Sequence, residues 1–320
     1  MTKRTIGLWV PTRTSLSPIS IERPGMWMES LKADFLSALA KHSDYQIIDG
    51  LDFRRAYIHN GSVYCDETNF ADVEVLFWFG ELDRRHTSYH IEMLEAIGQQ
   101  TRVVNDGPST RIALDKLVTQ LCLHRHGIPV PEFIAVSRDN LYDVRSIVEK
   151  KSFIIKPRLG SFGVGIMQVA NFDQLVDLVD YSEQAAHFLE EYIVSSPEQF
   201  IGINVIGGTI VSSYGKEPAS FRGWKVFDRE RRGGHMVPRV PSPEQQKIAL
   251  AVAQATGLDM LGIDIVQSSE SGANYVIDVN SFPGLYPDLN MQFGHDVAGL
   301  CVKLISSKLE SARASAAFSD

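Results

Sequence analysis

Short apolar runs alternate with helical patterns along the first hundred residues. The apolar runs cover residues 6–10, 45–49, 73–79 and 102–105, and the helical patterns cover about 28–41 and 89–99. Strands that alternate with helices favour a parallel sheet with helices packed on it. We therefore expect residues 1–107 to form a small open-sheet α/β domain, with Asn60-Gly61 turning an added hairpin over residues 57–64.

A helical pattern begins again after a linker at residues 105–109. It predicts one helix over residues 110–126, which Gly127 and Pro129 end. Its buried stripe is expected to be Leu114, Leu117, Val118 and Leu121. Lys116 would then lie on a different face of the helix.

A strand over residues 153–157 delivers Lys156 to a loop that contains Gly160, Gly163 and Gly165, and extended structure resumes at 166–169. A dinucleotide-binding loop would instead place Gly-x-Gly-x-x-Gly at the start of a helix. A glycine hairpin lets backbone N–H groups approach phosphate oxygens, and Lys156 would add a positive charge. The pattern therefore favours a phosphate site, and an ordinary strand-end lysine is the alternative.

The second half of the chain favours mixed α+β structure. Extended segments are expected at 133–136, 187–193, 200–206 and 210–213, with a weaker helix at 141–150. Ser242 and Gln245 form a capping box that opens a helix, which Gly257 closes. A last helix is expected over 297–309, followed by a frayed tail from residue 311.

Oxygen-bearing side chains occupy two further apolar strands, at 261–266 and 275–280. Asp264 lies in the first strand, and Asp278 and Asn280 lie two residues apart in the second. Strict alternation would put Val276 behind these two and turn Ile277 and Val279 to the opposite layer. Such a sparse oxygen set suits Mg²⁺, which keeps several waters and a phosphate-bearing substrate. Acids that end strands and face water are the alternative.

Composition narrows the class of protein. The 320 residues are 44% hydrophobic and 22% charged, as in a soluble globular protein with two or three compact modules. No early apolar run is long enough for a signal peptide or membrane span, and Cys65, Cys122 and Cys301 lack zinc or disulfide spacing, so a reducing cytoplasm is expected.

Charge adds a second constraint. A net charge of −8 argues against nonspecific binding to nucleic acid or an anionic membrane. Residues 222–239 run against that balance, with six basic residues and two acidic ones, a local charge of +4. This basic segment suggests a small anionic ligand, and a solvated loop is the alternative.

An ordered series of motifs carries a family resemblance. The series is Lys156-Pro, the glycine loop, Glu190-Glu-Tyr-Ile193, Arg231-Arg-Gly-Gly234, Gly262-Ile-Asp264 and Asp278-Val-Asn280-Ser-Phe-Pro-Gly. In this order the motifs resemble the ATP-grasp superfamily, and most of all its RimK-type carboxylate–amine ligases, over roughly residues 105–305. The resemblance implies an ATP-grasp domain at 108–310. Its central or lid subdomain would cover about 127–193 and its catalytic subdomain about 194–310, before a frayed tail at 311–320.

The resemblance also implies roles for individual residues. Lys116 and Lys156 would contact the phosphates of ATP, and Arg232 would lie near the transferring phosphate. The phosphate-covering loop would be Gly160, Ser161, Phe162, Gly163, Val164 and Gly165. The adenine-binding hinge would be Glu191, Tyr192 and Ile193. Asp264, Asp278 and Asn280 would hold Mg²⁺, with Mn²⁺ as a substitute.

The chain departs from the family pattern in several places. Asp278 stands where the family usually has glutamate, so the bridging of two metal ions is less certain. The ribose-binding acid falls on Phe200, and Glu198 is the expected substitute. The usual basic residue just beyond falls on Gly202, and Lys225 would supply the lost charge. The usual asparagine before the arginine is not at its place.

The implied activity is ATP-dependent. A carboxylate, of an amino acid or peptide, would be activated as an acyl phosphate and joined to an amine, with release of ADP and phosphate. Alternatives are a small-molecule kinase that stops at phosphoryl transfer and a regulatory ATP-binding module without catalysis. Glu81, Asp83, Arg84 and Arg85 follow a strand end and are candidates for substrate contact, with solvation as the alternative. A homodimer is one open arrangement.

Overall fold

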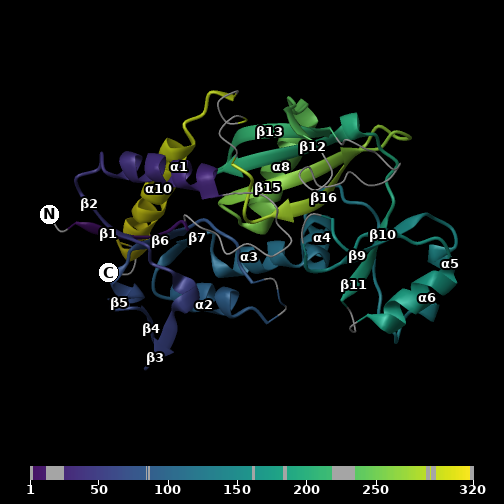
Figure 1. The fold of residues 1–320 in the computed structure, drawn as a ribbon, viewed down its shortest axis with the longest axis horizontal. Helices are drawn as coiled ribbons and strands as arrows, with labels where there is room; N and C mark the ends of the chain where they lie inside the picture. Colours follow the sequence, from purple (N-terminus) through teal and green to yellow (C-terminus); the bar gives the residue numbers. More distant parts are fainter. Residues whose placement is uncertain are drawn as a thin grey trace.

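The computed structural model describes residues 3–11, 25–83, 85, 87–160, 163–182, 186–217, 235–285, 289 and 293–317. The strands in these residues form four sheets. Figure 1 shows the N-terminal elements at one end, β12, β13, β15 and β16 in the middle, and β9 to β11 with α5 and α6 at the other end. In this described part, no helix is both long and apolar enough to cross a membrane.

The N-terminal sheet is parallel, with the strand order β2-β1-β6-β7. Its strands are β1 (Arg4–Trp9), β2 (Tyr45–Asp49), β6 (Val75–Trp78) and β7 (Arg102–Val104). Val75 and Phe77 enter one core and Leu76 and Trp78 enter the other, as strand alternation requires. Helix α1 (Gly25–Leu39) covers the first face and α2 (Tyr89–Gly98) the second. The predicted open parallel sheet is confirmed.

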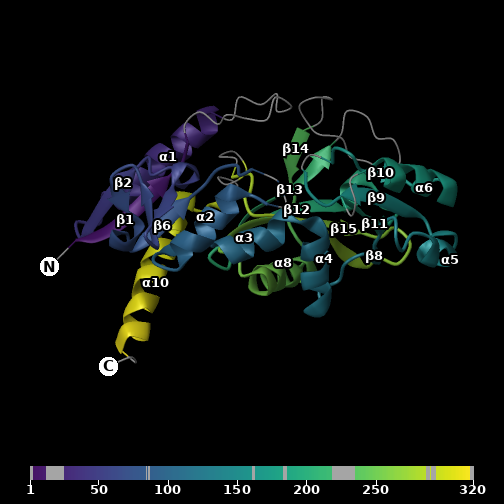
Figure 2. The same ribbon diagram turned by 90° about the horizontal axis from the view of Figure 1, so that it is seen from below.

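Helix α10 (Val297–Ala317), from the far end of the chain, completes the core on the α1 face. Figures 1 and 2 both show it beside the N-terminal sheet, and the Tyr45 hydroxyl lies 2.8 Å from Ser306 Oγ. This helix continues past residue 309, so the frayed tail expected from residue 311 is helical as far as Ala317. The last stretch contains no glycine or proline and is rich in alanine, which favours a helix.

The predicted hairpin is part of a small antiparallel sheet on the α2 side. Its strands are β3 (Tyr57–His59), β4 (Ser62–Cys65) and β5 (Thr68–Asn69). Asn60 and Gly61 both have positive φ, 49° and 80°, as a tight hairpin turn requires.

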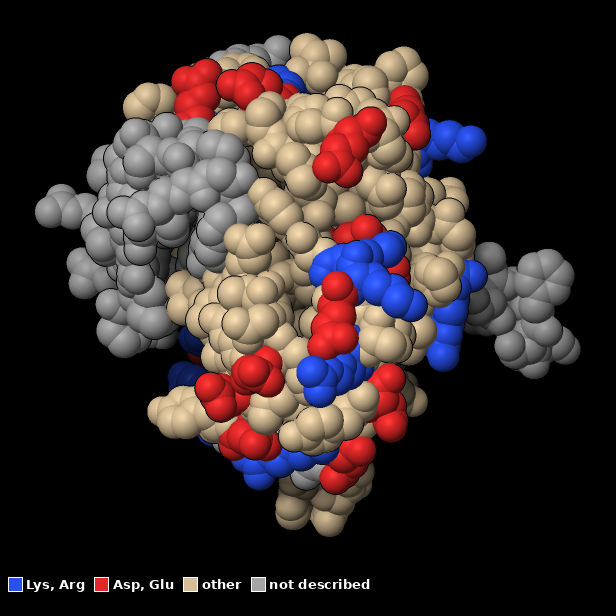
Figure 3. All heavy atoms as spheres, turned by 90° about the vertical axis from the view of Figure 1, so that its right-hand side faces the viewer, with Lys and Arg blue, Asp and Glu red and all other residues tan. Residues whose placement is uncertain are grey.

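A third sheet, with the order β10-β9-β11-β8, forms the far end of the molecule. Its elements are β8 (Phe133–Ala135), α5 (Arg145–Val148), β9 (Phe153–Pro157), β10 (Met167–Gln168), α6 (Phe172–Tyr181) and β11 (His187–Glu191). The sequence analysis did not predict α6, which Asn171 caps by accepting from the Gln174 amide. Figure 3 shows basic and acidic side chains interspersed on this end, where Arg145 pairs with Glu149.

The fourth sheet is antiparallel, with the order β14-β13-β12-β15-β16. Its strands are β12 (Phe200–Ile206), β13 (Thr209–Glu217), β14 (His235–Pro238), β15 (Met260–Gln267) and β16 (Asn274–Asn280). Helix α8 (Pro243–Thr256) packs on it after the predicted Ser242–Gln245 capping box and ends at Gly257, whose φ is 72°. The α+β half of the predicted fold is thus confirmed.

The single helix predicted over residues 110–126 is wrong. Two helices, α3 (Gly107–Leu114) and α4 (Lys116–Arg125), meet at Asp115, whose carboxylate caps α4. The break rotates the second helix, so Val118 and Leu121 of the expected stripe are each 37% exposed while Leu123 is fully buried.

Candidate active site

The predicted metal ligands lie on neighbouring strands. Asp264 of β15 is directly opposite Asp278 of β16, and Asn280 is opposite Gly262. Ile263 and Ile265, on either side of Asp264, belong to the core beneath the sheet, so Asp264 points to the other face. The carboxylates and the amide therefore share one face of the strand pair.

A β-bulge interrupts this strand pair. The register shifts between Asp264 and Ile265, and Ile277 of β16 is left without a partner in the ladder. Val276 and Val279 both enter the core, at 0% and 1% exposure. The expectation that Val276 and Val279 face opposite layers is therefore wrong, because the extra residue resets the alternation.

Lys156 reaches the bulge from β9. Its ammonium donates to the backbone oxygen of Ile277 at 2.9 Å and to Glu190 Oε1 of β11 at 2.9 Å. Gln120 donates to the other Glu190 oxygen at 2.7 Å. Burial raises the pKa of Glu190, and the Lys156 ammonium and Gln120 oppose that rise. The bulge thus supplies a carbonyl that fixes a buried lysine.

The sequence analysis assigned a role to Glu191 and not to its neighbour Glu190. In β11 the two side chains point to opposite sides: Glu190 is 2% exposed, and Glu191 lies 3.2 Å from the surface residue Lys151. Phe188 and Leu189 before this pair are both apolar and fully buried, so alternation along the strand gave no signal for which of the two acids points inward.

Lys116 is the first residue of α4 and points at the paired acids. Its ammonium lies 2.7 Å from Asp278 Oδ1. Its backbone amide donates to Arg158 O at 2.9 Å, and the Arg158 side chain pairs with Asp115, the cap of the same helix. Arg158, at the start of the glycine loop, therefore holds the first turn of α4 in place and so positions Lys116.

Lys216 is a further cation at this site, which the sequence analysis missed. Its ammonium lies 3.1 Å from Asp264 Oδ2 and 4.0 Å from the centre of the Phe200 ring. The analysis expected this strand to end at residue 213, and β13 continues to Glu217. The sequence pattern did not show how far β13 extends beside β12, so it did not indicate that Lys216 lies within this strand.

Tyr214 occupies the space at Gly202, where the family resemblance places a basic residue. Gly202 is the register partner of both Tyr214 and Asp264, and a Cβ atom on Gly202 would lie 2.3 Å from the Tyr214 ring. Any side chain at position 202 would therefore force the Tyr214 ring to move. In the described part of the site, the cation beside Asp264 is Lys216.

The donor set fits a magnesium ion. Burial raises the pKa of Asp264, with a further increase from the Asp278 charge and an opposing effect of Lys216. Two such carboxylates attract cations, and here Lys116 and Lys216 each approach one of them. No group of three His, Cys, Asp or Glu side chains able to hold a metal occurs in the described residues. Two carboxylates and the Asn280 amide would leave most positions of Mg²⁺ to water and phosphate.

The glycine loop joins β9 and β10 as an antiparallel hairpin, as predicted. Gly160, Gly163 and Gly165 all have positive φ, at 135°, 64° and 80°, which side chains rarely adopt. Val164 is 53% exposed between them. Ser161 and Phe162 lie outside the described residues.

The predicted hinge begins at Glu191, the last residue of β11. The amides of Glu191 and Tyr192 donate to Glu132 O and Ser152 O. Of the three predicted hinge residues, these bonds leave the backbone amide of Ile193 to donate a hydrogen bond to adenine.

Glu198, the expected ribose ligand, lies in a short 3-10 helix (Pro197–Gln199). Arg239 donates to the backbone oxygens of Pro197 and Glu198, at 2.9 and 2.8 Å, and to that of Phe200. This arginine fixes the backbone around Glu198, and the ribose contact itself stays a prediction.

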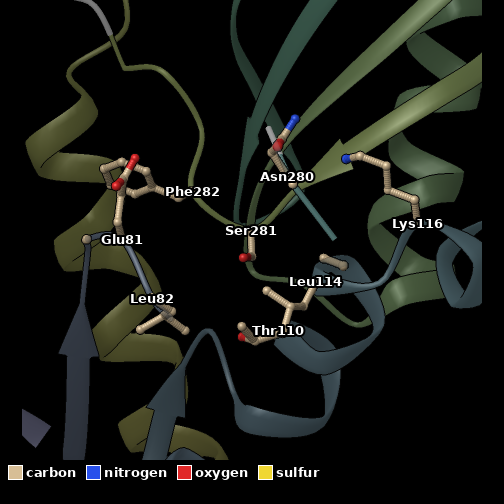
Figure 4. A pocket seen from close by; sticks show the side chains of 11 residues that line it. Glu81, Leu82, Thr110, Leu114, Lys116, Asn280, Ser281 and Phe282 are labelled. Carbon is tan, nitrogen blue, oxygen red and sulfur yellow. The ribbon is translucent and has the colours of Figure 1, made fainter. Parts of the chain in front are cut away.

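A pocket adjoins the acids where the end of β6 approaches α3 and the end of β16 (Figure 4). Its lining consists of Gly80, Glu81, Leu82, Thr110, Ala113, Leu114, Lys116, Gly160, Asn280, Ser281 and Phe282. Asn105 joins the two sides by donating to the backbone oxygens of Met260, at 2.7 Å, and Ser281, at 3.0 Å. The carboxyl end of β6 thus faces the end of β16 that carries Asp278 and Asn280, and open parallel sheets bind ligands beyond the carboxyl ends of their strands.

Some predicted residues cannot be placed. Arg232, Lys225 and most of the basic segment at 222–239 lie outside the described residues, and so does Arg84. Arg239 is described and makes the backbone contacts given above. The structure thus brings together Lys116, Lys156, Asp264, Asp278 and Asn280 from the predicted set, and adds Glu190 and Lys216.

Comparison with known proteins identifies the domain family. Residues 113–305 match the RimK-like ATP-grasp domain. The chain is 28% identical over 217 residues to a "Probable alpha-L-glutamate ligase" of Chromohalobacter salexigens, a match that covers 67% of this chain and 70% of the relative.

Solved structures show the same fold at lower identity. The VanG D-Ala:D-Ser ligase of Enterococcus faecalis aligns with a TM-score of 0.66 and 16% identity, over 96% of this chain and 100% of that chain. The ATP-grasp ligase PsnB, complexed with a precursor variant, Mg and ADP, aligns with a TM-score of 0.62 and 14% identity, over 96% and 99%.

Proposed function

Because the chain belongs to the RimK-like ATP-grasp domain family, we propose that it is an ATP-dependent ligase that joins a carboxylate to an amine. The observation that carries the proposal is the cross-strand pair of Asp264 and Asp278, with Lys116 and Lys216 beside it. The relative of C. salexigens bears the name of an alpha-L-glutamate ligase, which supports an amino acid or a peptide as the carboxylate substrate.

Asp264, Asp278 and Asn280 would hold Mg²⁺, and Mn²⁺ could replace it. The bound ion would neutralise phosphate charge as the phosphoryl group is transferred. The Lys116 ammonium contacts Asp278 in the structure. Once this acid binds metal, the ammonium can move from Asp278 to a phosphate oxygen. Among described residues, Glu190 and Ile277 take two of the three donors of Lys156, which leaves one for phosphate.

The chemistry requires two displacements, because a carboxylate is a poor electrophile. A carboxylate oxygen attacks the γ-phosphorus, the bond to the bridging oxygen breaks, and ADP leaves. The amine nitrogen then attacks the carbonyl carbon of the acyl phosphate, the bond from that carbon to the phosphate oxygen breaks, and the amide forms as phosphate leaves and the nitrogen gives up one proton. Lys116, Lys156 and the glycine loop would orient the phosphates and exclude water, and Arg232 would stabilise the transferring group.

Trapping of the acyl phosphate tests the proposal. Purified enzyme is incubated with ATP, Mg²⁺, hydroxylamine and a panel of amino acids and dipeptides, and hydroxamate and ADP are measured together. A ligase gives equal amounts of both, and only when a carboxylate is present. A stable phosphorylated acceptor without free phosphate would instead identify a kinase.

A further inference from the structure

The pocket beside the acids has two chemically different ends. Lys116 and Asn280 lie at the end next to the paired carboxylates, and Glu81 lies on the opposite side, after β6 (Figure 4). Leu114 and Ser281 lie between them, and Leu82 and Phe282 flank Glu81. A molecule that fills this pocket meets a cationic, metal-binding end, an apolar middle and an acidic far end.

Glu81 is not neutralised by the described part of the protein. The next acid along the chain, Asp83, pairs with Arg85 at 3.0 Å, whereas the described residues place no cation within ion-pair distance of Glu81. A carboxylate that lines a partly apolar pocket favours a ligand with a positive charge.

Thr110 gives an independent indication of a ligand. This residue is 1% exposed, it lines the same pocket from α3, and its Oγ1 atom has no hydrogen-bond partner in the described structure. Buried hydroxyl groups are almost always paired, because an unpaired one loses its bonds to water. A polar group of a bound molecule can supply the missing partner.

The proposed reaction fixes which way a substrate lies. The carboxylate that receives the phosphoryl group has to approach the end with Lys116 and Asn280. The rest of the same molecule then extends past Leu114 toward Glu81. Resting on the proposed ligase function, we infer that the carboxylate donor is an amino acid or short peptide whose free ammonium pairs with Glu81 while Thr110 bonds a polar group of its backbone.

A charge-deletion test separates this inference from the ligase function. Hydroxamate formation is measured with free amino acids and dipeptides, and with their N-acetyl counterparts, which lack the positive charge. The wild-type enzyme should prefer the free amine by about tenfold or more in kcat/KM, as for a charge-assisted hydrogen bond. In Glu81→Gln this preference should disappear, so that the ratio of kcat/KM for free and N-acetyl donors falls to about one.

Two further variants complete the test, one as a control and one at Thr110. Glu67→Gln changes an exposed acid in the turn after β4, and it should keep the wild-type preference. Thr110→Val removes a hydroxyl that bonds nothing in the described structure, so unfolding should be unchanged or shifted to higher denaturant, whereas KM for the donor should rise. A stability loss without a KM change would give Thr110 a purely structural role and overturn its part of the inference.

The remaining outcomes are distinct. N-acetyl donors that react as well as free ones would leave the ligase function standing and overturn the assignment of Glu81. A preference that survives in Glu81→Gln would do the same. If neither series yields hydroxamate, the proposed function fails and the inference falls with it.

Discussion

The Lys156 ammonium lies 2.9 Å from Glu190 Oε1, and the two side chains are only 5% and 2% exposed. Each group alone would be a strongly disfavoured buried charge. Gln120 and the carbonyl of Ile277 complete the network from two other elements, α4 and the bulge of β16. The pair therefore couples the β9–β11 sheet to the sheet that carries the acids.

Glu190→Gln should destabilise the protein by about 3 kcal/mol or more, because it leaves the Lys156 ammonium buried without a counter-charge. Lys156→Met combined with Glu190→Gln should recover much of that loss, since no uncompensated charge remains. Urea unfolding of the single and double variants measures both effects. Glu149→Gln, in an exposed pair with Arg145, should leave the midpoint almost unchanged. A double variant no more stable than Glu190→Gln would contradict the pairing argument.

Local patterns were sufficient for much of the fold. Short apolar runs located β1, β6, β15 and β16, and the capping box at Ser242 located α8. Strand alternation put Asp278 and Asn280 on one face, because residues two apart share a face, and the structure adds Asp264 directly opposite Asp278. These features depend on neighbours in the chain, which the sequence displays.

Features that depend on distant contacts were not predictable. The bulge at Ile277 is fixed by Lys156, 121 residues away along the chain. The break at Asp115 is held by Arg158 from the glycine loop. Lys216 becomes a site residue only because β13 extends far enough for its ammonium to reach Asp264. These three contacts join residues far apart in the chain, so the local hydrophobic pattern does not predict them.

Turnover should require both strand-pair acids. Asp278→Asn and Asp264→Asn keep side-chain volume but remove the charges that would bind Mg²⁺, and each should lower hydroxamate formation by about a hundredfold or more. Removing metal with a chelator should stop turnover, and added Mg²⁺ should restore it. Asp66→Asn, in an exposed turn of the small sheet, is the matched control. Wild-type rates in either variant at limiting Mg²⁺ would exclude these acids as the metal ligands.

Gly202→Ala should destabilise the protein by about 1–3 kcal/mol, because the new Cβ would lie 2.3 Å from the Tyr214 ring in a packed sheet. Gly98→Ala is the control: no atom lies within 4 Å of a Cβ built there, so that substitution should be neutral or slightly stabilising. Thermal unfolding compares the two. Adding Tyr214→Ala to Gly202→Ala should relieve the crowding. An unchanged melting temperature in Gly202→Ala would mean that the Tyr214 ring moves aside at no cost.

Lys216→Met should lower kcat for hydroxamate formation by about tenfold to a hundredfold, because the charge beside Asp264 would be lost where phosphate charge has to be stabilised. The Lys216 ammonium lies between the Asp264 carboxylate, 3.1 Å away, and the Phe200 ring, 4.0 Å away, so its position is set from two sides. Lys216→Arg keeps the charge and should retain most of the activity, which separates a charge effect from lost packing. Lys303→Met, on the exposed face of α10, should change neither kcat nor stability. If Lys216→Met turns over like the wild type, Lys216 does not replace the basic residue that the family usually has at the position of Gly202. Lys225, the replacement predicted from the sequence, then becomes the residue to substitute next.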